Sequence, residues 1–293
     1  MPPDSATARG RQSRSEFLHV RGLRCHVRRW GDPSLPQLFL THGWLDVSAT
    51  FQPLVEHLLD RWQVLLPDWR GFGYSEWPQD GYWFYDYVAD LEGILDHYSP
   101  QAPVLLAGHS MGAQVVALYA GARPQRVRKL VCLDGIGLPD MPAQRAPQRV
   151  RKWLDDLRAL PQVKTYESFE QLAGRVRKQH PQLTPEHALF IARCWGHQDA
   201  RGRIRLCADP KHTMAGPLLY RAAEAEEVWK QITAPTLFID AGKSALALPP
   251  EERARRRAAF QDQRVVTIPD AGHMLHFDAP RETAAAIAAF MAD

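Results

Sequence analysis

The stretch LLAGHSMGAQVV, residues 105–116, passes from one apolar run through two glycines and a serine into a second apolar run. Gly108, Ser110 and Gly112 match the pattern Gly-x-Ser-x-Gly at the junction of a predicted strand and a predicted helix. At such a sharp turn the serine is strained, and the flanking glycines let neighbouring backbone approach without a Cβ clash. The serine hydroxyl then stands at a helix N-terminus, where main-chain N–H groups stabilise negative charge. The stretch therefore predicts a strand–turn–helix unit with Ser110 as a nucleophile.

Short apolar runs alternate with longer amphipathic ones on both sides of this stretch. Each short run is bounded by Gly, Asp or Pro, as expected for strands that are buried on both faces of a parallel sheet. The predicted strands are PQLFLTHG (36–43), WQVLLPD (62–68), APVLLAGHS (102–110), RKLVCLDG (128–135), APTLFIDAG (234–242) and QRVVTIPD (263–270). Helical patterns occupy 85–98, 111–127 and 280–292. This alternation predicts the α/β class, with residues 15–31 as an antiparallel hairpin at the sheet edge.

The chain divides into an α/β core and one insertion. Residues 1–14 are polar and rich in Arg and Ser, which predicts a disordered N-terminal tail. Residues 137–222 are rich in Arg, Gln and Pro and contain helical stretches but no pattern of a buried strand. We therefore expect a helical cap at 137–222, inserted into a core that comprises residues 15–136 and 223–293.

Charge and cysteine content exclude several classes of function. The chain has 36 Lys and Arg against 33 Asp and Glu, a net charge of +3, which is too weak for a nucleic-acid partner. The basic run EERARRRAAF (251–260) is interpreted as a solvated helix face. The four cysteines lie far apart, which favours free thiols, and no apolar segment is long enough to be a signal peptide or to span a membrane. We expect a cytoplasmic monomer or homodimer with a small-molecule substrate and no membrane partner.

Three motifs in the right order resemble those of the α/β-hydrolase superfamily. They are THGWLD (41–46), similar to its oxyanion loop, DWRGFGYS (68–75), similar to the turn after its fourth strand, and GHSMG (108–112), similar to its nucleophile elbow. The resemblance covers residues 15–136 and 224–292. It implies a mostly parallel eight-stranded sheet flanked by helices with an inserted cap. It also implies that the N–H groups of Trp44 and Met111 form the oxyanion hole, and that Asp68, Arg70 and Gly71 organise the loop beneath it.

A neutral serine needs a base, and in this fold the base follows the last strand. The segment IPDAGHMLHFDAP (268–280) supplies His273 directly after a turn glycine, with His276 three residues later. We expect His273 to be the base and His276 to begin or cap the final helix.

The acid has two candidates. Many members of the family place it after the seventh strand, but the corresponding positions here are Lys243 and Ser244. Asp134 lies in the middle of the segment KLVCLDGIGLP (129–139), which is similar to the stretch that carries the acid after the sixth strand in a subset of the family. A carboxylate there could accept the Nδ1–H of His273 and fix its tautomer. We favour Asp134, with Asp240 as the alternative acid.

These residues indicate acyl transfer to water. Dehalogenases and epoxide hydrolases of this fold attack with an aspartate, whereas position 110 is a serine. The pattern most resembles the serine hydrolase-like group, which predicts a carboxylesterase-like enzyme acting on esters of small to medium apolar or aromatic acids through an acyl-enzyme. A cofactor-free dioxygenase, a C–C bond hydrolase and a non-catalytic ligand-binding protein remain as alternatives.

The sequence also suggests substrate contacts but no cofactor. We expect His109 and Trp69 to contact the substrate. Aromatic side chains that could line the mouth of the site are Trp44, Trp69, Phe72, Tyr74, Trp83 and Phe84. The histidines of the insertion, His180, His187, His197 and His212, lack paired ligand spacing, so no metal site is predicted.

Overall fold

A computed structural model describes residues 12–246 and 248–292 of the chain. The predicted disordered tail, residues 1–14, therefore lies mostly outside the described residues. Its last residue, Arg14, already begins strand β1 (Arg14–Val20).

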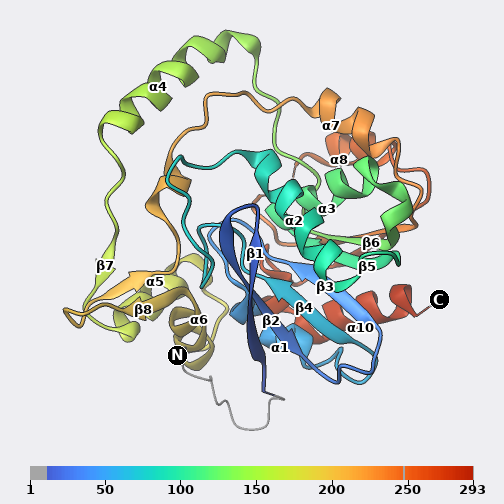
Figure 1. Ribbon diagram of the computed structural model, residues 1–293, viewed down its shortest axis with the longest axis horizontal. Helices are drawn as coiled ribbons and strands as arrows, with labels where there is room; N and C mark the ends of the chain where they lie inside the picture. The colour runs from blue at the N-terminus through green and yellow to red at the C-terminus, as the bar shows by residue number, and fades with distance from the viewer. Residues whose placement is uncertain (1–11, 247, 293) are drawn as a thin grey trace.

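One eight-stranded sheet forms the centre of the molecule (Figure 1). Its other strands are β2 (Leu23–Trp30), β3 (Gln37–Thr41), β4 (Gln63–Pro67), β5 (Val104–His109), β6 (Val127–Leu133), β10 (Thr236–Ala241) and β11 (Gln263–Ile268). The order is β1-β2-β4-β3-β5-β6-β10-β11, and all neighbours from β4 onward are parallel. The pairs β1–β2 and β2–β4 are antiparallel. The predicted α/β fold, its mostly parallel eight-stranded sheet and its edge hairpin are confirmed.

Helices cover both faces of this sheet (Figure 1). One face packs against α2 (Phe84–Tyr98), α3 (Met111–Ala122) and α7 (Ala222–Trp229), and the other against α1 (Gln52–Val55) and α10 (Pro280–Met291). Every residue of α3 from Gly112 to Gly121 is buried, as its nearly uniform apolar sequence requires. The predicted helix 111–127 ends earlier, at Ala122. Proline disfavours helical geometry at the residue before it, and Arg123 directly precedes Pro124.

Between β6 and α7 the chain forms a separate set of helices and short strands, which we call the cap. Its elements are α4 (Ala146–Arg158), β7 (Thr165–Tyr166), α5 (Phe169–Gln179), α6 (Pro185–Trp195), β8 (Gly196–Gln198) and β9 (Ile204–Leu206). The described residues also form short 3-10 helices, two in the core at Ser48–Phe51 (η1) and Pro124–Arg126 (η2) and two after β6 at Ala143–Arg145 (η3) and Pro210–Thr213 (η4). The three-stranded sheet β7-β9-β8 was not predicted, because strands of two or three residues are too short to show an alternating pattern.

The cap rests on the core through its own apolar cluster. Side chains of α5 and α6 pack together with Met274 and Phe277, which follow His273 in the core. Helix α9 (Leu275–Asp278) carries Phe277. The position of the cap is therefore coupled to the segment that carries His273.

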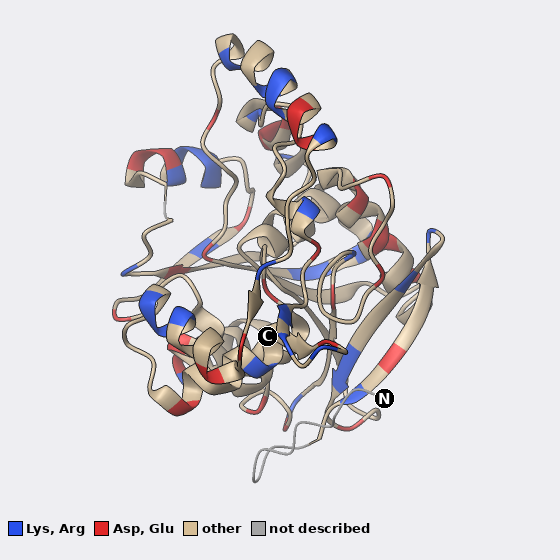
Figure 2. Ribbon diagram, turned by 90° about the vertical axis from the view of Figure 1, so that its left-hand side faces the viewer, with Lys and Arg blue, Asp and Glu red and all other residues tan. Residues whose placement is uncertain are grey.

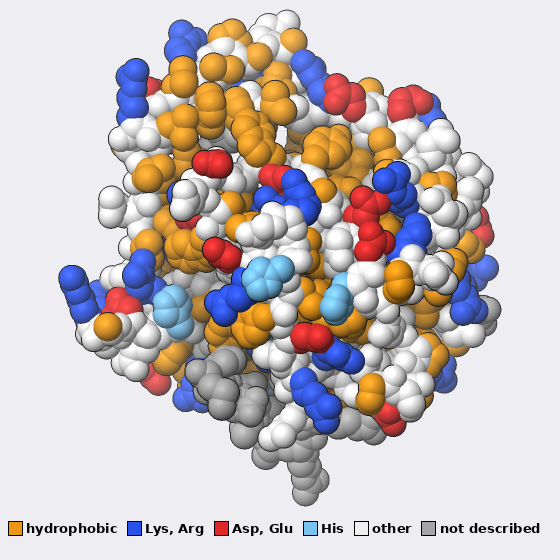
Figure 3. Space-filling view, in the orientation of Figure 1, with side chains coloured by type: hydrophobic (Ala, Val, Ile, Leu, Met, Phe, Trp, Pro, Cys, Tyr) orange, Lys and Arg blue, Asp and Glu red, His pale blue; other side chains and the backbone are white. Residues whose placement is uncertain are grey.

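Helix α4 is the most exposed element of the cap (Figure 1). Apolar side chains gather over the region of α4 in the space-filling view, and Val150, Leu154 and Leu157 are all more than two-fifths exposed (Figure 3). Acidic and basic residues are interspersed over the rest of the ribbon, consistent with the small net charge (Figure 2). No helix within 12–246 or 248–292 is long and apolar enough to cross a membrane.

Candidate active site

Ser110 occupies the sharp turn between β5 and α3. Its backbone has φ 53° and ψ −114°, a strained conformation for a residue with a side chain, and its N–H donates to the carbonyl of Leu133 at 2.9 Å. A Cβ at Gly108 would lie 2.5 Å from the main chain of Gly112, and a Cβ at Gly112 would lie 2.6 Å from Thr41 Oγ1. Both glycines are therefore required by the close approach of β3, β5 and α3.

A continuous hydrogen-bonded series joins Ser110, His273 and Asp134. His273 Nε2 lies 3.0 Å from Ser110 Oγ, and His273 Nδ1 lies 2.6 Å from Asp134 Oδ2. The imidazole and carboxylate are largely shielded from solvent, with side chains 17% and 5% exposed. With a proton on Nδ1, held by the carboxylate, the Nε2 lone pair faces the serine hydroxyl. This arrangement can remove the serine proton during attack on a carbonyl carbon.

Asp134 reaches His273 because the chain turns sharply after β6. Its φ is 42°, in the left-handed region, where aspartate is tolerated better than most residues. Its N–H donates to the carbonyl of Ile239 at 2.9 Å, and its Oδ1 accepts from the N–H of Ala241 at 3.3 Å. The neighbouring strand β10 thus holds the carboxylate at the sheet edge beside His273.

Asp240, the alternative acid, has different partners. It forms ion pairs with Arg253 at 2.8 Å and with Arg257, both on α8 (Pro250–Arg257). No contact between Asp240 and His273 is present in the described part of the chain. The alternative acid is therefore wrong for this conformation: two guanidinium groups neutralise Asp240 away from the imidazole.

Ser244 is one of the two positions that the family resemblance aligned with the usual acid. Its Oγ lies 3.5 Å from His273 Nδ1, the same nitrogen that contacts Asp134. The usual position for an acid is thus close to the imidazole, but a neutral hydroxyl fills it.

The loop after β3 brings the N–H of Trp44 to the same end of the sheet. No acceptor for that N–H is found among residues 12–246 and 248–292, and Met111 N–H is the first of α3, which leaves it without a partner inside the helix. Both residues adjoin Ser110 or line the same cavity. The oxyanion hole formed by the N–H groups of Trp44 and Met111 therefore stays a prediction.

Asp68 supports the oxyanion loop from below, as the motif resemblance implied. Its Oδ1 accepts from Ser48 N–H at 2.6 Å and its Oδ2 contacts His26 Nδ1 at 2.7 Å. Burial opposes ionisation of this carboxylate, but the charge and hydrogen bond of His26 outweigh it and hold the pKa of Asp68 below its usual range. Arg70 forms an ion pair with Asp90 at 2.5 Å and so joins this turn to α2.

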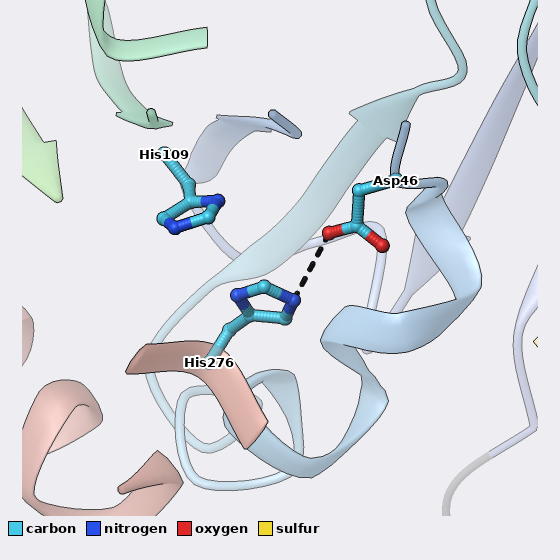
Figure 4. Close-up of side chains that lie close together, drawn as sticks. All are labelled: Asp46, His109 and His276. Atoms are coloured by element: carbon cyan, nitrogen blue, oxygen red, sulfur yellow. Dashed lines mark ion pairs between the residues drawn. The ribbon is translucent and has the colours of Figure 1, made fainter. Parts of the chain in front are cut away.

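Asp46, His109 and His276 form a second buried group (Figure 4). Asp46 Oδ2 pairs with His276 Nε2 at 3.0 Å, and its Oδ1 accepts from Thr50 Oγ1 at 2.8 Å and from Trp195 Nε1 at 2.9 Å. Burial opposes ionisation of Asp46, but the charge and hydrogen bond of His276 hold its pKa low. Asp46 therefore connects the oxyanion loop to the cap, through Trp195, and to α9.

His109 links this buried group to the catalytic candidates. Its Nε2 lies 2.7 Å from the main-chain carbonyl of His273, so a proton on Nε2 is donated to that carbonyl. Burial, with the nearby charges of His276 and His273, moves the pKa of His109 well below its ordinary value. A neutral His109 thus holds the His273 loop. Sequence reasoning missed the role of Asp46 and Trp195, because their contact joins residues far apart in the chain.

Asp46, His109 and His276 are also the group in the described chain that could hold a metal ion. One potential ligand atom from each lies within 4.8 Å of the others. The direct Asp46–His276 ion pair and the ring of Phe51, stacked on His276 at 3.9 Å, already occupy the space around His276. A four-coordinate ion with metal–ligand distances of about 2.0–2.1 Å would require these contacts to open.

A cavity of about 660 Å³ lies over Ser110 and His273. Residues of the oxyanion loop, the cap and the loop after β10 line it, including Trp44, Leu172, Val176, Trp195 and Leu246. This volume suits a small-molecule ligand, and most of the lining is apolar.

Of the two residues predicted to contact the substrate, His109 lines the cavity and Trp69 does not. His109 lines the cavity although it is only 1% exposed, and Trp44 lines it as well. Trp69 does not line it, so that expectation is wrong: its ring is fully buried and its Nε1–H donates to the carbonyl of His42 at 2.9 Å. The other aromatic residues expected at the mouth, Phe72, Tyr74, Trp83 and Phe84, are also not among the lining residues.

Comparison with known proteins relates the chain to hydrolases of the alpha/beta hydrolase fold. The model of a family described as alpha/beta hydrolase fold matches residues 36–280. A 2-(acetamidomethylene)succinate hydrolase from Mesorhizobium japonicum is 28% identical over 94% of this chain and 95% of its own length. An sn-1-specific diacylglycerol lipase from Mus musculus is 26% identical over 89% of this chain and 83% of its own length. The solved thioesterase domain from the curacin biosynthetic pathway has a TM-score of 0.83 and 26% identity, covering 94% of this chain and 98% of that domain.

Proposed function

The chain belongs to the alpha/beta hydrolase family, and from this premise we propose that it is a carboxylesterase-like serine hydrolase. Its substrate is an ester of a small to medium apolar or aromatic acid, cleaved through an acyl-enzyme. The observation that carries the proposal is the series from Ser110 Oγ to His273 Nε2 at 3.0 Å and from His273 Nδ1 to Asp134 Oδ2 at 2.6 Å.

The first half of the reaction transfers the acyl group to the enzyme. Ser110 Oγ attacks the ester carbonyl while His273 Nε2 takes its proton, and the Asp134 carboxylate stabilises the imidazolium. The carbonyl oxygen becomes an oxyanion that accepts hydrogen bonds from the N–H groups of Trp44 and Met111. The bond to the leaving oxygen then breaks, and His273 returns the proton to the departing alcohol.

The second half returns the enzyme to its starting state. Water gives a proton to His273 Nε2 and attacks the acyl-enzyme carbonyl, the bond to Ser110 Oγ breaks, and the proton passes from His273 to Ser110 Oγ. The products are the acid and the alcohol, and no group outside the chain is consumed except water.

The relatives support hydrolysis as the reaction class. The names of a lipase, a thioesterase domain and a succinate-derivative hydrolase all describe hydrolytic or acyl-transfer enzymes. The cavity supports a compact ligand, since its lining is mostly apolar and includes Trp44 and Trp195.

The test is the Ser110→Ala variant assayed with p-nitrophenyl acetate and butyrate. We expect loss of turnover and loss of labelling by a fluorophosphonate probe, with unchanged thermal unfolding. Ser244→Ala is the matched control, because its hydroxyl also lies beside His273 but on the Nδ1 side. Undiminished turnover in Ser110→Ala would refute the serine mechanism. Oxygen uptake that survives this substitution would instead indicate the cofactor-free dioxygenase.

A further inference from the structure

Helix α5 turns one side toward the cavity that contains Ser110. Leu172, Arg175, Val176 and Gln179 all line this cavity, and their spacing of three and four residues places them on one side of the helix. Leu172 and Val176 are buried in the cap cluster. Arg175 and Gln179 add a cation and an amide to an otherwise apolar wall.

Arg175 has no carboxylate partner among the residues that the structure describes. Its Nη1 donates to the hydroxyl of Tyr166, and its guanidinium lies 5.9 Å from the centre of that ring. The residues four positions away on either side are Gln171 and Gln179. The acid of α5, Glu170, lies five positions before Arg175, outside the three- and four-residue spacing at which helix side chains pair. The side chain is half-buried, and within 12–246 and 248–292 the hydrogen bond to Tyr166 is the one found for its five N–H donors.

The other charged residues of the cavity neutralise each other. Lys243 and Asp270 form an ion pair at 2.8 Å on the exposed rim, where their side chains are 66% and 89% exposed. Asp278 is not among the lining residues, and its Oδ1 accepts from Gln182 of the lining at 2.7 Å. Arg175 is thus the cavity cation whose charge stays uncompensated within 12–246 and 248–292. A guanidinium in a mostly apolar cavity is unfavourable unless an anion pairs with it.

We propose that the ester hydrolysed at Ser110 carries a free carboxylate away from the scissile bond, and that Arg175 binds this carboxylate. This inference rests on the proposed function. The planar guanidinium can donate two parallel hydrogen bonds to a carboxylate, and this geometry gives orientation as well as affinity. The amide of Gln179, one turn along, can donate to the same group. Arg175 is therefore a specificity-determining residue.

The test compares charged and neutral esters. On the acyl side, p-nitrophenyl hemiglutarate is paired with p-nitrophenyl pentanoate; on the alcohol side, para-acetoxybenzoate is paired with phenyl acetate. For each pair the ratio of kcat/KM, corrected for spontaneous hydrolysis, measures the preference for a carboxylate. We expect the wild-type ratio to favour the charged ester in one of the pairs, and Arg175→Met to reduce that ratio about 10- to 100-fold.

Arg177→Met is the matched control. Arg177 lies on the same helix but is exposed and does not line the cavity, so its loss should leave both ratios unchanged. Binding of glutarate, followed by calorimetry, gives a readout that does not need turnover: wild type should bind and Arg175→Met should not.

The outcomes separate this inference from the proposed function. Ser110-dependent hydrolysis of neutral esters with no charge preference in either pair, or with a preference that survives Arg175→Met, overturns the carboxylate inference alone. Absence of hydrolysis and of fluorophosphonate labelling overturns the serine mechanism, and glutarate binding still decides whether Arg175 forms an anion site. An equal loss in Arg177→Met would show a general charge effect and would also overturn the inference.

Discussion

Replacing Asp134 by asparagine should abolish most of the turnover without disturbing the fold. In the native protein the carboxylate lies 2.6 Å from His273 Nδ1 and holds a proton there, which leaves Nε2 free to accept from Ser110 Oγ at 3.0 Å. The amide of asparagine can donate to Nδ1 and so favours the opposite tautomer, with its proton on Nε2 facing the serine. A base of the wrong tautomer cannot take the serine proton, and we expect kcat to fall about 10⁴-fold.

A second substitution tests whether the position or merely the presence of an acid matters. Ser244 Oγ lies 3.5 Å from the same Nδ1, so Asp134→Asn/Ser244→Asp places a new carboxylate beside the imidazole. We expect the double variant to recover part of the lost turnover. Ser244→Asp alone should not show this gain, because Asp134 already occupies Nδ1.

The assay is hydrolysis of p-nitrophenyl butyrate, with circular dichroism as the measure of folded protein. Asp240→Asn is the control and should keep most of the activity. It should lower the free energy of unfolding by about 2–3 kcal/mol, because Arg253 and Arg257 lose their charged partner. Both arginines are partly exposed to water, which limits this loss. Full activity in Asp134→Asn, together with a large loss in Asp240→Asn, would refute the assignment of the acid.

Three further predictions concern the packing around the site. Gly112→Ala should lower the free energy of unfolding by about 1–3 kcal/mol in urea titrations, since its Cβ would lie 2.6 Å from Thr41 Oγ1; an unchanged midpoint would contradict this. The amide of asparagine in Asp46→Asn cannot accept every hydrogen bond that the carboxylate accepts, so this variant should have an unfolding free energy lower by about 1–3 kcal/mol and a lower kcat/KM. Trp195→Phe removes only one donor to Asp46 and should lower the unfolding free energy less. The pKa of His109 is lower in the folded protein than in the unfolded chain, so as the pH falls the unfolded chain takes up this proton before the folded protein does. The free energy of unfolding should therefore decrease below about pH 6.5, by up to about 1.4 kcal/mol per pH unit. His109→Gln should show a weaker dependence of unfolding free energy on pH, and an unchanged dependence would show that His109 contributes nothing.

The strands, the elbow and the order of the motifs could be predicted from the sequence because they depend on local patterns. A buried parallel strand has a short apolar run, and the turn at Ser110 needs small residues on both sides. The strand pattern gave β3 to β6, β10 and β11 within a few residues. Local patterns do not determine which way an aromatic side chain points. Trp44 and Trp69 follow the neighbouring strands β3 and β4, but Trp44 lines the cavity whereas Trp69 is buried against His42.

Contacts between the cap and the core could not be predicted in the same way. The hydrogen bond from Trp195 to Asp46 joins positions 149 residues apart, and neither residue type is unusual at its place in the sequence. The same holds for Arg175, which looks like any charged residue on an amphipathic helix until the fold places it in the cavity wall. Such residues acquire a role only through the position of the cap.

The two candidate acids differ in their surroundings because of α8, a helix whose sequence was interpreted as a solvated face. Strands β6 and β10 are paired with Leu133 opposite Ile239, so Asp134 and Asp240 follow at the same level of the sheet edge and are equivalent in the sequence pattern. Arg253 and Arg257, one turn apart on α8, bind Asp240, while Arg256 of the same helix is fully buried and donates to the carbonyl of Ile136 at 3.0 Å. The interpretation of EERARRRAAF as a solvated face was therefore wrong for these three arginines. Two arginines of α8 pair with Asp240, whereas Asp134 pairs with His273, and this difference in partners is what supports Asp134 as the proposed acid.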